Sequence, residues 1–131
     1  MFRLPKKFAE QLISHCRAEY PNEACGLLGG KAGEATRVFE MTNAERSPVI
    51  YRMEPKEQLR AFNEIEQDNL ELVGIYHSHT RSAAYPSATD VQWAYYPEAA
   101  YVIVSLAEEP AVLRAFSIVN QQVSEIEMEL F

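Results

Sequence analysis

Residues 70–90 read Leu-Glu-Leu-Val-Gly-Ile-Tyr-His-Ser-His-Thr-Arg-Ser-Ala-Ala-Tyr-Pro-Ser-Ala-Thr-Asp, and this stretch decides the fold. Its first ten residues, up to His79, alternate with the period of two that is typical of a β-strand. The alternation predicts one face with Val73, Ile75, His77 and His79, and another with Leu72, Gly74, Tyr76 and Ser78. A loop over residues 80–86 and a short helix that begins at Ser87 are expected to follow.

Three side chains of this stretch form a candidate metal site. His77 and His79 are two residues apart on a strand, so both imidazoles lie on one face. Asp90 lies one turn into the next helix, from which its carboxylate can turn back toward them. Two histidines and one aspartate leave the fourth tetrahedral position of Zn²⁺ open to water, as in catalytic rather than structural sites. Zinc bound in this way activates water and polarises a carbonyl group.

The same residues also have ordinary explanations, which the sequence leaves open. A His-x-His pair taken alone occurs in many surfaces and cores. Ser87-x-x-Asp90 is also a capping box, in which the serine at the start of a helix and the acid three residues later each accept a hydrogen bond from the other's backbone amide. The two roles are compatible, because a capping geometry fixes where Asp90 points. Hydrolysis also needs a general base and an oxyanion stabiliser, for which Glu23 and Ser87 are the candidates.

Composition excludes several classes of protein. The 131 residues suffice for one domain, over residues 1–131, with a single core. A net charge of −7 disfavours nucleic-acid phosphates and anionic membranes. Cys16 and Cys25 are too few for a disulfide framework and are expected to pack as small buried side chains. No apolar run is long enough to cross a membrane, so a soluble, cytoplasmic protein is expected.

The flanking patterns predict the remaining elements. Helices are expected over residues 5–19 and 55–69, the first burying Phe8, Leu12 and Cys16 and the second burying Leu59, Phe62 and Ile65. Further strands are expected over residues 24–30, 34–41, 49–53, 101–106, 111–119 and 123–130, the last two as a closing antiparallel pair. The aromatic residues Trp93, Tyr95, Tyr96 and Tyr101 are expected in the core or an interface. The order predicts an α+β, or mixed α/β, fold with one sheet sandwiched by helices.

The joint pattern closely resembles the JAMM (MPN+) zinc metalloprotease family. It comprises His77-x-His79, seven residues, then Ser87-x-x-Asp90, with Glu23 upstream in Asn-Glu-Ala-Cys-Gly-Leu-Leu-Gly. The resemblance covers nearly the whole chain and implies an MPN/JAB1-like fold related to that of cytidine deaminase. It implies Zn²⁺ held by His77, His79 and Asp90. It also implies that Glu23 takes a proton from the attacking water and that Ser87 stabilises the tetrahedral intermediate.

One departure from the family's pattern points to its compact prokaryotic branch. Eukaryotic members usually have proline after the second histidine, where this sequence has Thr80. Resemblance to the compact branch implies a peptidase that acts on the C-terminal tail of a ubiquitin-like or sulfur-carrier protein and releases cysteine. A cleft beside strands suits an extended tail, and a narrow slot suits its Gly-Gly end. Because compact relatives often form dimers, a homodimer is one expected state.

Other functions remain open from the sequence. Many MPN domains have lost their ligands and serve only as scaffold or binding modules, although all the ligand positions are filled here. A peptidase acting on Lys-linked isopeptides or on cell-wall peptides is a second alternative. A DNA-repair relative is disfavoured by the acidic charge and by Thr80. A zinc deaminase is excluded, because no Cys-x-x-Cys is present.

Overall fold

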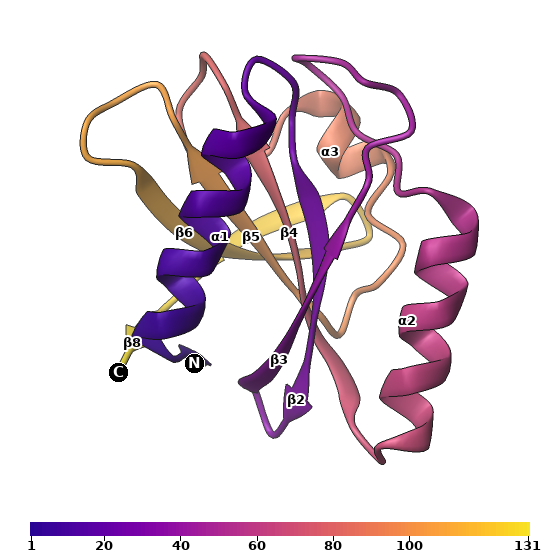
Figure 1. The fold of residues 1–131 in the computed structure, drawn as a ribbon. Helices are drawn as coiled ribbons and strands as arrows, with labels where there is room; N and C mark the ends of the chain where they lie inside the picture. The colour runs from indigo at the N-terminus through magenta and orange to yellow at the C-terminus, as the bar shows by residue number, and fades with distance from the viewer.

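A single eight-stranded sheet organises the chain, and the computed structural model describes residues 1–131. The strand order is β7-β6-β5-β4-β2-β3-β1-β8, with β4 and β5 parallel at its centre (Figure 1). This confirms the expected α+β class with one sheet. The elements are β1 (Phe2–Leu4), α1 (Lys6–Glu19), β2 (Cys25–Lys31), β3 (Glu34–Met41), α2 (Pro55–Gln67), β4 (Glu71–His79), α3 (Ala88–Gln92), β5 (Ala100–Ser105), β6 (Val112–Val119), β7 (Gln122–Ile126) and β8 (Met128–Leu130).

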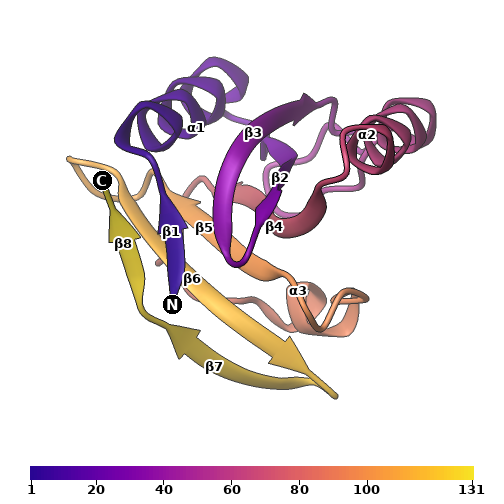
Figure 2. The ribbon, with the colours of Figure 1, turned by 90° about the horizontal axis from the view of Figure 1, so that it is seen from below.

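Two hydrophobic cores lie on opposite faces of the central strands. Helix α1 packs on one face, where Leu12 and Cys16 meet Leu28 and Tyr76. Helix α2 covers the other face, where its Ala61 and Ile65 meet Leu27, Ile75 and Ile103. Figure 2 shows the two helices on either side of β2, β3 and β4. Strand β4, which carries His77 and His79, is therefore shielded from water on both sides.

A β-bulge at Val73 interrupts the alternation of side chains that was predicted for β4. The pairing with β2 skips this residue, since Leu28 pairs with Gly74 and Gly29 pairs with Leu72. An extra residue in one strand reverses the faces of the residues before it. Val73 consequently packs on the α1 side, whereas Leu72 joins Ile75 on the α2 side. The prediction holds beyond the bulge but is wrong for Leu72 and Val73.

The N-terminal and C-terminal segments pair with each other, which the sequence did not indicate. The short strand β1 runs parallel to β8, with Phe2 opposite Met128 and Leu4 opposite Leu130. The expected strand over residues 123–130 therefore divides at Glu127: β7 pairs with β6, and β8 pairs with β1. Glu127 offers its carbonyl group to the Phe2 amide at 2.9 Å, which stabilises the bend.

Two further expectations are wrong in detail. The segment 49–53 is a loop rather than a strand, and it contributes a single bridge between Asn43 and Met53. In α2 the side chain of Leu59 is 63% exposed, because the buried stripe runs through Ala61 and Ile65 instead.

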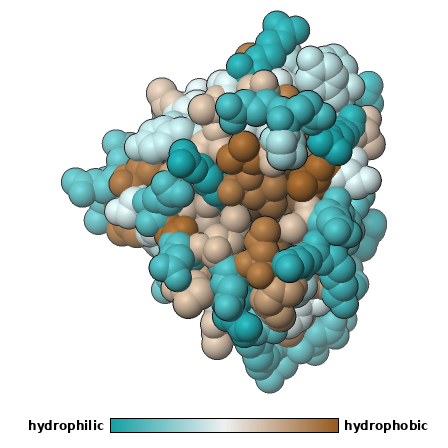
Figure 3. All heavy atoms as spheres, turned by 90° about the vertical axis from the view of Figure 1, so that its left-hand side faces the viewer, coloured by the Kyte–Doolittle hydropathy of each residue, from teal (hydrophilic) through white to brown (hydrophobic).

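Figure 3 shows the side that lies to the left in Figure 1, where α1, β6 and β8 are found. Apolar side chains gather in the middle of this face, inside a polar rim. No second molecule is seen against this apolar face, so the homodimer expected from the sequence stays a prediction. No helix of the chain combines the length and apolar character needed to cross a bilayer.

Candidate metal centre and active site

The end of β4 and the start of α3 bring the three candidate ligands together. His77 Nε2 lies 3.2 Å from His79 Nε2 and 3.1 Å from Asp90 Oδ2. His79 Nε2 lies 2.9 Å from the same Asp90 oxygen. Donors around a tetrahedral zinc ion, with bonds of about 2.0–2.2 Å, lie roughly 3.3 Å apart. Two imidazole nitrogens and one carboxylate oxygen at these separations fit a divalent metal.

The capping box of α3 orients Asp90. Ser87 Oγ accepts a hydrogen bond from the Asp90 amide at 3.1 Å, and the Asp90 carboxylate accepts one from the Ser87 amide at 2.9 Å. The carboxylate oxygen that closes the box is the same atom that faces both histidines. The structure thus confirms the expected capping box, whose geometry turns the Asp90 carboxylate toward both histidines.

The two histidines are held by different contacts. His79 Nδ1 lies 2.8 Å from the Ala83 carbonyl group, so Nδ1 carries a proton, and in the neutral imidazole the lone pair is on Nε2, toward the cluster. The His77 ring stacks on Tyr51, with 4.6 Å between centroids and 23° between planes. Both histidines are buried, at 1% and 4% exposed. This packing restricts both rings to the orientation that the cluster requires.

Charge within the cluster favours an ionised Asp90. Burial alone would raise the pKa of this carboxyl group, but hydrogen bonds from His77, His79 and the Ser87 amide outweigh it and hold the pKa well below its usual range. Burial would likewise lower the pKa of His79, but its hydrogen bonds with Asp90 and Ala83 prevail and raise it. The site therefore already favours positive charge beside the Asp90 carboxylate.

Glu23 lies beside this cluster, separated from the start of β2 by Ala24. Cys25 pairs with His77, and the Ser78 amide donates to the Ala24 carbonyl group, so Glu23 lies alongside His79. Its side chain is only 3% exposed, and Oε1 has no hydrogen-bond partner. Burial raises the pKa of Glu23 to about 8; the charge of Asp90 adds to this effect and that of His79 opposes it. A carboxyl group with this pKa can both accept and donate a proton near neutral pH.

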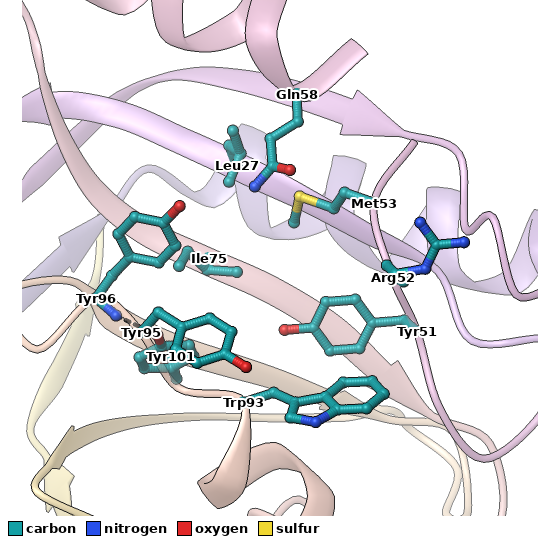
Figure 4. Close-up of a pocket in the computed structure, with 10 residues that line it drawn as sticks. All are labelled: Leu27, Tyr51, Arg52, Met53, Gln58, Ile75, Trp93, Tyr95, Tyr96 and Tyr101. Atoms are coloured by element: carbon teal, nitrogen blue, oxygen red, sulfur yellow. Dashed lines mark hydrogen bonds between the residues drawn. The ribbon is translucent and has the colours of Figure 1, made fainter. Parts of the chain in front are cut away.

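An aromatic pocket of about 370 Å³ adjoins the cluster. Figure 4 shows the Tyr51 and Trp93 rings on one side and Tyr96 and Tyr101 on the other, with Gln58 and Met53 above them. Tyr51 contributes to the pocket wall and also stacks on His77, so a group bound here lies next to the candidate ligands. The remaining lining residues are Leu27, Arg52, Ile75 and Tyr95.

Comparison with known proteins places this architecture in a family. Residues 5–119 match the prokaryotic homologs of the JAB domain. The chain belongs to the prokaryotic JAB family. It is 44% identical over 117 residues to the CysO-cysteine peptidase of Mycobacterium tuberculosis, covering 87% of this chain and 80% of that protein. It is 35% identical over 103 residues to the desampylase of Haloferax volcanii, covering 73% and 74% of the two chains.

A solved structure supports the fold. The solution structure of a protein from Desulfitobacterium hafniense superposes with a TM-score of 0.89 at 38% identity, covering 100% of this chain and 93% of that one. The family assignment confirms the expected JAMM/MPN resemblance and its fold.

Sequence reasoning missed part of the surroundings of this JAB site. Tyr51, which stacks on His77, was expected in a strand, and Asn43, which donates to the Glu23 carbonyl group, was not singled out; both lie in an irregular segment. Of the aromatic residues expected in the core or an interface, Tyr101 is buried in the core, whereas Trp93 is 41% and Tyr95 71% exposed, and all of them line the pocket. Thr80, which replaces the usual proline, donates its hydroxyl to the Pro48 carbonyl group at 3.1 Å and so ties the two loops together.

Proposed function

We propose that the chain is a zinc-dependent peptidase that hydrolyses the amide bond at the C-terminal Gly-Gly tail of a ubiquitin-like or sulfur-carrier protein and releases cysteine. One observation carries this proposal. His77, His79 and Asp90 converge within 4.8 Å of one another, beside the buried, unpartnered carboxyl group of Glu23. The names of the mycobacterial and archaeal relatives support the substrate class.

In this proposal each residue of the site has a separate role. His77, His79 and Asp90 would hold Zn²⁺, which supplies Lewis-acid chemistry when bound. Glu23 takes a proton from the attacking water and passes it to the leaving amine, which its pKa of about 8 supports. Ser87 Oγ accepts from the Asp90 amide, so its own hydroxyl proton is free to stabilise the developing oxyanion.

The aromatic pocket is the proposed place for the carrier tail. Eight of its ten lining residues are hydrophobic, and none is acidic, so it suits a large apolar side chain better than an ammonium group. The tail residues next to the scissile bond would be small, because His77 is packed closely against Tyr51. We place this reaction in the cytoplasm, a proposal that the two free, buried cysteines support.

A mass-spectrometric assay tests the proposal. A small sulfur-carrier protein bearing a C-terminal cysteine adduct is incubated with the chain, with and without a zinc chelator. We expect zinc-dependent loss of one cysteine from the carrier, and no loss with the Glu23→Gln variant, which keeps all three ligands. A bulky residue in place of the penultimate glycine of the carrier should abolish turnover. Unchanged turnover of the bulky carrier would refute the idea that the tail next to the scissile bond binds in a narrow slot.

A second leaving group is tested in the same assay. Because one relative is named a desampylase rather than a cysteine-releasing peptidase, a lysine-linked adduct is included in parallel. If only the lysine adduct is hydrolysed, the chain is still a peptidase, but its leaving group is a lysine amine and not cysteine. One zinc per chain with no turnover of either adduct would favour a scaffold or binding module.

A further inference from the structure

Asn43 is a buried hydrogen-bonding centre at the edge of the candidate site. Asn43 is 5% exposed, and Thr42 alone separates it from the end of β3. Its Nδ2 donates to the carbonyl groups of Glu23 and Ile50, both at 3.0 Å. Its Oδ1 accepts from the amides of Glu45 at 3.0 Å and Arg52 at 3.1 Å. An asparagine side chain has two donors and room for two acceptor bonds, so all four are used.

The loop 43–53 also replaces the sheet as the support of Glu23. Strand β2 begins at Cys25, so the backbone of Glu23 lies outside the ladder. Its amide donates to the Ser47 carbonyl group at 2.8 Å, and its carbonyl group accepts from Asn43. Both backbone groups of Glu23 are therefore held by one loop, and that loop is closed by the Asn43 side chain.

The same loop holds the ring that packs on a candidate ligand. Tyr51 lies between Ile50 and Arg52, whose backbone groups are both bonded to Asn43. The Tyr51 ring stacks on His77. The Asn43 side chain thus joins the backbone beside the candidate base to the residue that packs on a candidate metal ligand.

From these contacts we infer that Asn43 is a positioning residue, which sets the place of the Glu23 carboxylate relative to His77, His79 and Asp90. The inference rests on the proposed function. The carboxyl group of Glu23 has no bond of its own through Oε1, so its position depends on its backbone and on packing. A displacement of about 1 Å in a reacting group can reduce the rate by about 100-fold. A contact that fixes this backbone therefore bears on the rate and not on metal binding.

Two substitutions and one control test the inference. Asn43→Asp keeps the acceptors for Glu45 and Arg52 but removes the donors to Glu23 and Ile50. Asn43→Ala removes both sets. The control, Thr42→Val, removes the hydroxyl bond to Glu57 at 2.9 Å in the neighbouring position. Activity is measured on the carrier–cysteine adduct, and zinc content on the same samples.

We expect kcat to fall by about 10- to 100-fold in both Asn43 variants, with KM within about two-fold and one zinc per chain retained. Thr42→Val should keep the kcat of the parent. A parent-like kcat in Asn43→Asp would overturn the inference while leaving the proposed function intact. A parent chain without turnover would overturn the proposed function, and the inference with it.

Amide hydrogen exchange by NMR provides a measurement that does not depend on turnover, and its result for the parent does not depend on any variant. In the parent, the Glu23 amide should exchange slowly, because it donates to Ser47. In Asn43→Asp the exchange of Glu23 should become faster while that of Leu27, within the ladder, stays unchanged. Free exchange of the Glu23 amide in the parent would show that the loop does not hold it, and would overturn the inference.

Discussion

Replacing Glu23 with glutamine should increase the free energy of unfolding of the metal-free protein. The same substitution should remove the turnover of the zinc-loaded protein. Burial raises the pKa of this carboxyl group from 4.5 to about 8, and Oε1 has no partner. The folded state therefore binds a proton that the unfolded chain releases near pH 4.5. A raised acid pKa means that this group costs stability progressively as the pH rises from about 4.5 through 8.

The magnitude follows from the shift. At about 1.36 kcal/mol per pKa unit, the penalty is about 1 kcal/mol at pH 5 and about 3 kcal/mol at pH 7. Glutamine has the shape of the protonated acid and does not titrate, so the variant avoids this penalty. The stability gained by Glu23→Gln should therefore grow with pH. A zinc ion beside Glu23 favours its carboxylate, so adding zinc should reduce the gain.

Urea unfolding followed by circular dichroism measures this gain. Parent and variant are compared at pH 5, 7 and 8 in chelator, and again with zinc. The difference between the two proteins isolates Glu23, because every other side chain is the same in both. A difference that does not change with pH would refute the burial of an unpaired carboxyl group at this position. Steady-state kinetics of the zinc-loaded variant should show a loss of kcat of about 100- to 10,000-fold.

Three other changes have expected outcomes. His77→Ala should lose bound zinc in native mass spectrometry, because two donors hold the ion far less tightly than three. Ser87→Ala should cost about 1 kcal/mol in urea unfolding through loss of the α3 cap. It should also lower kcat by about 100-fold or more, because an oxyanion donor is lost. Carrier tail peptides with a large apolar side chain should shift the emission of Trp93, the only tryptophan, to shorter wavelength.

Each of these outcomes has a contrary result. One zinc per chain in His77→Ala would remove this residue from the ligand set. Unchanged kcat in Ser87→Ala, with the expected loss of stability, would leave Ser87 only its capping role. Identical Trp93 spectra with leucine and alanine peptides would place the tail outside the aromatic pocket.

The site was predictable because its geometry is local. His77 and His79 are two residues apart on one strand, and the Ser87 cap fixes Asp90 three residues later. Period and capping chemistry depend only on near neighbours, so the sequence indicates them directly. Glu23 is different: it is a candidate base from the sequence, and the family resemblance supports that choice, but nothing within its own segment places it beside His79.

The missed features depend on contacts distant in the sequence. The three-residue strand β1 has no alternation long enough to recognise, and it forms because it pairs with β3 on one side and β8 on the other. The bulge at Val73 leaves no mark in the apolar pattern, since Leu72 and Val73 are both hydrophobic and each face offers a core. Asn43 has no apolar periodicity around it, and its importance becomes visible only when its four partners are located.

The pairing of β1 with β8 has a practical consequence for attaching the protein to other molecules. Both termini lie together at the lower left of Figure 1, whereas α3, which carries Asp90, lies near the top. Between β8 and the ligand-bearing β4 the sheet interposes β1, β3 and β2. Affinity tags, fluorophores or a solid support joined to either end should therefore leave the entrance to the site open. Immobilised protein should process carrier adducts at the rate of the free chain.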